Sequence, residues 1–156
     1  MLNLFRVPTT LPRKLEELGV SPALVLRHAG LPPGLFDEEK IQVSTEELFA
    51  LYRGLAEASD DPAIGLRLGA EDRVERYDPI TLAALSARSL RDALERMARY
   101  KQLVCPEELT VEERVDEALV RFRWLFAEET EPPVLIDLCF AAVVHIAHRG
   151  TGALVA

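Results

Sequence analysis

The segment that most constrains the fold is a long apolar run from Val134 to Ala147. It follows Glu131-Pro132-Pro133 and reads VLIDLCFAAVVHIA, with apolar side chains on nearly every face of a helix. A helix of this kind is either buried by its own chain or shared with a partner chain. Because the run is short and contains Asp137 and His145, it does not read as a membrane span. The rest of the chain must therefore supply elements that cover this helix.

Signals that begin helices recur before Pro106. Ser44 and Glu47 have the spacing of a capping box, in which each side chain bonds the backbone N–H of the other residue. Other cap residues, most of them followed by a proline at the first helical position, begin segments at Ser21-Pro22, Asp61-Pro62, Asp78-Pro79 and Ser89. An earlier helix is indicated by Leu11, Leu15 and Leu18, which recur at helical spacing. The first part of the chain is therefore predicted to be a cluster of helices.

The pattern changes at Leu109. LTVEERV and LVRFRWLF alternate in polarity and are rich in β-branched and aromatic residues, which predicts an antiparallel hairpin over about residues 109–126. If Asp116 and Glu117 form the loop, one face is apolar and the other is matched in charge. The cross-strand pairs expected in this register are Val111 with Phe122, Leu109 with Trp124, Glu112 with Arg121 and Thr110 with Arg123. The apolar face must pack against helices, because a lone hairpin is only marginally stable.

These elements predict an α+β fold: an N-terminal helical cluster, a small antiparallel sheet packed against helices, and a buried C-terminal helix. A length of 156 residues fits a single domain over residues 1–156. The formal charge of −8 makes the chain a poor nucleic-acid binder by itself. Two cysteines cannot form a disulfide framework, and the opening MLNLFRVPTT does not read as a signal peptide. We therefore expect a soluble, cytoplasmic domain.

Few residues have the spacing of a catalytic or metal site. His145 and His148 lie one helical turn apart, but Asp137 is too far along the axis to join them on one metal. GLRLG at residues 65–69 lies within or at the end of a helix, so it is not a phosphate-binding loop. We expect no metal, no cofactor and no enzymatic activity. A metal-dependent sensor or small enzyme using His145, His148 and Cys139 is the alternative.

The candidate binding residues are aromatic or lie in the apolar run. Phe122, Trp124 and Phe126 share a strand face and, with Tyr100 on the preceding helix, are candidates for the lining of a small-molecule pocket. Cys139 is a further candidate for this pocket, although a plain core role explains these residues too. Leu135, Leu138 and Val143 are candidates for a homodimer interface. A protein-interaction domain without any small ligand is a further alternative.

The order of these pieces resembles the arabinose-binding-type N-terminal domain of AraC-type transcriptional regulators, from about Leu15 to Arg149. The strongest parts of the resemblance are the Ala-Gly-Leu-Pro turn at residues 29–32, the segment from Asp61-Pro62 to Gly69, and the helix containing Ser89, Leu94 and Tyr100. None of these motifs is a catalytic signature.

The resemblance implies a sensor and dimerisation domain that binds a small organic effector, which need not be arabinose. Such a domain normally precedes a C-terminal DNA-binding domain with two helix-turn-helix motifs. Because no basic recognition helix follows residue 149, we expect DNA contact only through a C-terminal domain absent from this chain, which resembles a truncated protein. The sequence does not identify the effector, the target genes, or whether the regulator activates or represses them.

Overall fold

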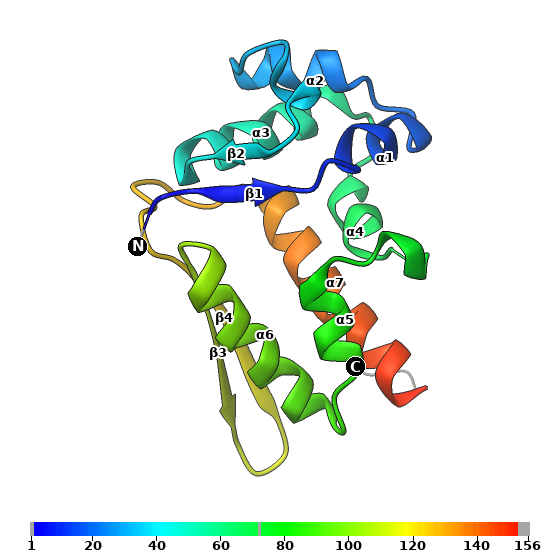
Figure 1. The fold of residues 1–156 in the computed structure, drawn as a ribbon, viewed down its shortest axis with the longest axis vertical. Coiled ribbons are helices and arrows are strands. Elements are labelled where there is room, and N and C mark those ends of the chain that lie inside the picture. The colour runs from blue at the N-terminus through cyan, green and yellow to red at the C-terminus, as the bar shows by residue number, and fades with distance from the viewer. Residues whose placement is uncertain (1, 72, 153–156) are drawn as a thin grey trace.

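The computed structural model describes residues 2–71 and 73–152, which form an α+β fold as predicted (Figure 1). The strands are β1 (Phe5–Val7), β2 (Ile41–Val43), β3 (Glu107–Glu113) and β4 (Ala118–Trp124). The α-helices are α1 (Leu11–Glu17), α2 (Pro22–Ala29), α3 (Thr45–Ala58), α4 (Ile64–Gly69), α5 (Pro79–Leu85), α6 (Leu90–Val104) and α7 (Pro133–Thr151). Short 3-10 turns, η1 (Leu35–Asp37) and η2 (Val74–Arg76), complete the described elements.

The helix starts follow the predicted cap residues closely. Ser44 accepts a hydrogen bond from the Glu47 N–H, and the Glu47 carboxylate accepts one from the Ser44 N–H, so the capping box is confirmed. The side chains of Ser21, Asp78 and Ser89 each accept a hydrogen bond from the backbone N–H three residues later and so cap α2, α5 and α6, without the reciprocal bond of the capping box. Asp61 instead accepts from the Ala63 N–H in a turn, and α4 begins at Ile64. These starts are predictable because cap and helix lie within one turn of each other.

A pair of three-residue strands was absent from the sequence prediction. β1 and β2 pair antiparallel, with Phe5 opposite Val43 and Val7 opposite Ile41. Their apolar side chains point into the core and the residue between them points to solvent. Asn3 links the residues before β1 to the start of α3, because its side-chain oxygen accepts hydrogen bonds from both the backbone N–H and the hydroxyl of Thr45.

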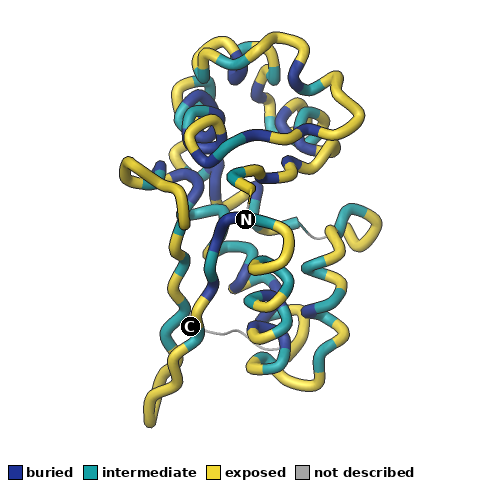
Figure 2. Tube along the Cα trace, turned by 60° about the vertical axis from the view of Figure 1, so that its left-hand side comes forward, coloured by how far each residue is buried: buried dark blue, intermediate teal, exposed yellow. Residues whose placement is uncertain are grey.

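The β3–β4 hairpin forms, but its register differs from the prediction by two residues. Leu109 lies opposite Phe122, and Glu107 opposite Trp124. The cause is the turn: the Arg114 N–H donates to the Glu117 carbonyl at 2.8 Å, so residues 115 and 116 turn the chain in place of 116 and 117. A shift of two residues leaves every side chain on its predicted face. The hairpin is increasingly exposed toward its tip (Figure 2).

The hairpin's polar face pairs charges across the strands despite the shift. Arg121 donates to Glu112 at 2.7 Å, although Leu119 is the direct partner of Glu112 in the ladder. Arg123 pairs with Glu108, which is its direct partner in the ladder. The expected contact of Arg121 with Glu112 is therefore a diagonal one, and Thr110 lies opposite Arg121 rather than Arg123.

Helix α7 joins the two hydrophobic cores of the fold. The N-terminal core is built by β1, β2 and α1 to α4 and includes Val134 and Leu135 at the start of α7. The C-terminal core is built by α5, α6 and β3 and includes Val143 and Ile146 further along α7. Figure 1 shows α7 running from the upper group of elements down to α5. The predicted C-terminal helix is thus present, but it is buried only in part, and it connects two cores rather than closing one.

The length and composition of α7 would also allow it to span a membrane. In this structure its apolar side chains enter both cores instead, through Val134, Leu135, Val143, Ile146 and Ala147. Contacts within the chain therefore cover part of the apolar surface of α7, while Phe140 and Val144 stay exposed.

Candidate ligand-binding site

A cavity of about 260 Å³, partly open to solvent, lies between β4 and α7. It is lined by Val120, Arg121, Phe122 and Trp124 from β4, by Glu131 from the connecting loop, and by Ile136, Cys139 and Phe140 from α7. Trp124 and Cys139 pack against the N-terminal core, whereas Val120 and Phe122 pack against the C-terminal core. The cavity therefore lies where the two cores meet.

Aromatic rings form a fixed wall on the strand side of the cavity. Trp124 packs against Phe5 and Phe49, with ring centroids 5.5 Å and 5.4 Å away. Phe122 meets Phe140 of α7 edge to face, at 5.1 Å between centroids. Such contacts add stability beyond the burial of apolar area and hold the rings in defined orientations. A ligand entering the cavity would meet a preformed apolar surface.

A buried ion pair lies beside this wall. Lys101 Nζ is 2.6 Å from Glu107 Oε2, and the two side chains are 15% and 3% exposed. Lys101 Nζ also lies 5.6 Å from the centroid of the Phe122 ring. The second Glu107 oxygen, Oε1, is buried without a hydrogen-bond partner among the described residues. One buried acceptor is thus left unused close to the cavity wall.

The thiols near the ion pair are held neutral. Burial, with a contribution from the Glu107 carboxylate, raises the pKa of Cys139 to about 12. Burial also raises the pKa of Cys105, whose thiol donates to the Lys101 carbonyl at 3.4 Å. Because the thiolate is the nucleophile and the metal ligand, both thiols act as packing groups near neutral pH.

The structure brings together some of the sequence-predicted residues and separates others. Phe122, Trp124 and Cys139 all line the cavity. Tyr100 on α6 is half-buried and is not among the lining residues, and Phe126 lies beyond β4 with its ring exposed. Sequence reasoning missed the Lys101–Glu107 pair. Its signal was the position of Glu107, which alternates with Leu109 and therefore shares the inward face of the hairpin.

The residues of the alternative metal site do not form a metal-binding group. Among the described residues, no cluster of three or more His, Cys, Asp or Glu side chains is placed to hold a metal ion. His145 Nε2 instead lies 3.1 Å from the Tyr77 hydroxyl, within hydrogen-bonding distance. Cys139 belongs to the cavity. No observation on the described residues favours the metal-dependent alternative.

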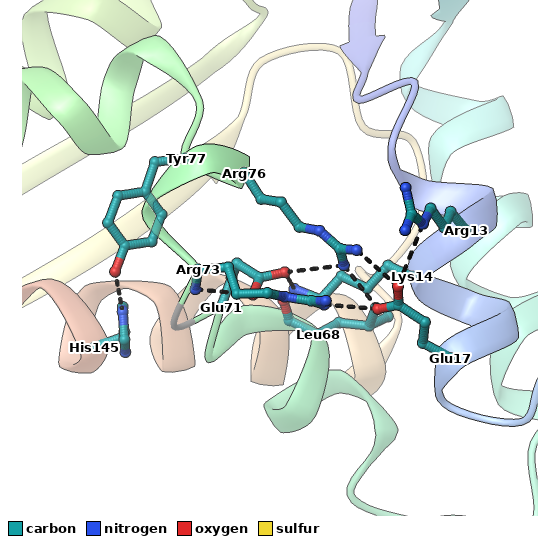
Figure 3. Close-up of polar contacts among 9 residues, drawn as sticks. All are labelled: Arg13, Lys14, Glu17, Leu68, Glu71, Arg73, Arg76, Tyr77 and His145. Atoms are coloured by element: carbon teal, nitrogen blue, oxygen red, sulfur yellow. Dashed lines mark hydrogen bonds and ion pairs between the residues drawn. The ribbon is translucent and has the colours of Figure 1, made fainter.

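A second polar cluster joins α1 to the segment that follows α4 (Figure 3). Arg73 and Arg76 both donate to the Glu17 carboxylate, at 2.6 to 2.7 Å, and these bonds lower the pKa of Glu17. Lys14 donates to the Leu68 carbonyl at 2.6 Å and lies 3.4 Å from Glu71. Because its carboxylates are engaged by neighbouring cations, we interpret this cluster as a structural tie.

The predicted dimer residues lie in or against the chain's own core. Leu135 and Val143 are 3% and 8% exposed, and Leu138 is partly buried against the N-terminal core. Their role in a dimer stays a prediction, but a second copy would first meet the exposed side chains beside them, Phe140 and Val144.

The fold and the cavity define the class of this protein as an α+β domain with a preformed, largely apolar cavity at the junction of two cores. A family model described as the arabinose-binding domain of AraC transcription regulators, N-terminal, matches residues 19–156. The chain belongs to this family, which confirms the resemblance seen in the sequence and identifies an N-terminal ligand-binding domain of a transcription regulator. A comparison with curated proteins found no match.

Proposed function

We propose that this chain senses a small organic effector in the cavity between β4 and α7 and thereby controls a separate C-terminal helix-turn-helix domain in the cytoplasm. The position of the cavity carries the proposal. Its lining comes from both cores and from the part of α7 that joins them. An effector bound there favours the arrangement of the cores that best fits it, which shifts the population of conformations presented to the DNA-binding domain.

The family does not identify the effector as arabinose. The rings of Phe122, Trp124 and Phe140 offer apolar surface, and the Cys139 thiol is neutral. Drug-sized pockets usually enclose about 300–1,000 Å³. A cavity of about 260 Å³ is therefore suited to a compact ligand with one ring or a short chain.

Filling the cavity should abolish effector binding. Val120→Phe places a ring among the lining residues, whereas Val115→Phe makes the same change at the hairpin tip, where the side chain is 99% exposed. A thermal-shift screen with amino acids, sugars, aliphatic acids, aromatic acids and amines should find a compound that raises the Tm of the unmodified chain. A ligand at a hundredfold excess over Kd adds about 2.7 kcal/mol, which corresponds to roughly 5–10 °C.

The same compound should leave the Tm of Val120→Phe unchanged and raise that of Val115→Phe normally. Because Trp124 is the only tryptophan and lines the cavity, its fluorescence should change as the compound is added. A full thermal shift in Val120→Phe, without a change in tryptophan fluorescence, would place the binding site elsewhere.

Homodimerisation is part of the same proposal. It is supported by exposed apolar side chains, which a second copy would cover. These side chains are Leu103, Val104, Leu125, Phe126, Phe140 and Val144. Sedimentation velocity should show a concentration-dependent dimer in the micromolar range. A single monomeric species at high micromolar concentration would contradict this part of the proposal.

A further inference from the structure

The cations near the cavity are already engaged by carboxylates. Arg121, the only cationic residue in the lining, donates to Glu112 at 2.7 Å. Beyond the lining, Arg53 donates to Glu129 at 3.0 Å. An anionic ligand would therefore have to compete with a protein carboxylate for the Arg121 guanidinium.

The remaining charge on the lining is negative. Glu131 lies at the cavity, in the loop between β4 and α7, and makes no ion pair with any part of the chain that the structure describes. Nearby, the Glu107 carboxylate is opposite Trp124 in the ladder, and its Oε1 atom is buried without a hydrogen-bond partner in the described residues. The charged groups that keep unused binding capacity near the cavity are therefore carboxylates.

The aromatic wall also favours a cation. Ring faces attract positive charge, and Phe122 already lies beside one ammonium group, that of Lys101. Phe140 and Trp124 are further rings in the lining. An amine that leaves water for this site would meet the Glu131 carboxylate and aromatic rings, whereas a carboxylate ligand would be repelled by Glu131.

We propose that the cavity binds a small organic cation, with its ammonium group at the Glu131 carboxylate and its apolar body against Phe122, Trp124 and Phe140. This inference rests on the proposed effector-sensing function and specifies the chemical class of the effector. Glu131 then selects for the positive charge of the ligand, and the rings supply affinity that does not depend on that charge.

Three probes of similar size and different charge test the inference: 2-phenylethylamine, 2-phenylethanol and 3-phenylpropionate. Each is titrated into the chain while Trp124 fluorescence is excited at a wavelength that the probes do not absorb. We expect 2-phenylethylamine to bind at least tenfold more tightly than the alcohol, and 3-phenylpropionate to bind more weakly than either. Glu131→Gln should weaken amine binding about tenfold and leave the alcohol unaffected.

Glu128→Gln is the matched control, since Glu128 lies in the same loop, is exposed and does not line the cavity. It should bind all of the probes as the unmodified chain does. Binding of 3-phenylpropionate as tight as that of the amine, or amine binding unchanged in Glu131→Gln, would overturn the cation class while keeping the cavity as the effector site. If none of the probes binds, the cation inference fails. If the broader screen also finds no ligand that Val120→Phe excludes, the proposed function fails with it.

Discussion

Replacing Gly65 or Gly69 with alanine should destabilise the fold by about 3 kcal/mol each, because α4 and α7 pack backbone to backbone at these positions. A Cβ atom at Gly65 would lie 2.3 Å from the Val134 carbonyl oxygen, and one at Gly69 would lie 2.4 Å from the Leu138 carbonyl oxygen. Both distances are far below van der Waals contact with rigid backbone. The helices must separate to admit the methyl group, which opens the junction between the two cores.

Whether alanine stabilises or destabilises the fold distinguishes the effect of close packing from that of helix propensity. In an exposed helix, alanine is more stable than glycine by about 0.5–1 kcal/mol. Gly150→Ala is the matched control, because Gly150 lies in α7 and a Cβ atom there meets nothing within 4 Å. Urea denaturation should show lower stability for Gly65→Ala and Gly69→Ala and equal or higher stability for Gly150→Ala. Equal stability of Gly65→Ala and the unmodified chain would refute the close packing of α4 and α7.

The fold could be predicted from sequence where the determining interactions are local. Ser21, Ser44, Asp78 and Ser89 each bond a backbone N–H three residues away, so their helices were recognisable without tertiary information. β1 and β2 were missed because three residues are too few for an alternating pattern, and Phe5 finds its partner Val43 far along the chain. The hairpin register depends on which two residues form the turn. The charge pattern alone did not distinguish a turn at residues 116 and 117 from one at residues 115 and 116.

The candidate site was predictable only in part, for a related reason. Alternation along β4 put Phe122 and Trp124 on one face, and both line the cavity. A helix that is apolar all round gives no such indication, so Ile136 and Phe140 of α7 could not be assigned to it. On α6 the sequence suggested Tyr100, but it is Lys101 that contacts Glu107 and lies beside Phe122. Whether Tyr100 or Lys101 faces the hairpin depends on the inward carboxylate of Glu107 on β3, which is a tertiary partner.

Removing the buried cation alone should be among the most damaging substitutions in the C-terminal part of the fold. Lys101→Met leaves the Glu107 carboxylate, 3% exposed, without its partner, and we expect a loss of about 3–5 kcal/mol. Burial is the largest single effect on Lys101 and opposes its charge, but the attraction and hydrogen bond of the Glu107 carboxylate, with smaller contributions from neighbouring groups, raise the pKa of the ammonium group overall. The ion pair is therefore intact at neutral pH, and urea denaturation of Lys101→Met at pH 7 measures its disruption.

The double variant Lys101→Met with Glu107→Leu should recover most of this loss, because an apolar pair avoids the desolvation of both charges. Arg91→Met is the comparison at the surface. It breaks the exposed ion pair of Arg91 with Glu113, for which we expect a loss below about 1 kcal/mol. If Lys101→Met costs no more than Arg91→Met, the Glu107 carboxylate is accessible to water. The Oε1 atom, which is buried without a hydrogen-bond partner among the described residues, would then be hydrated.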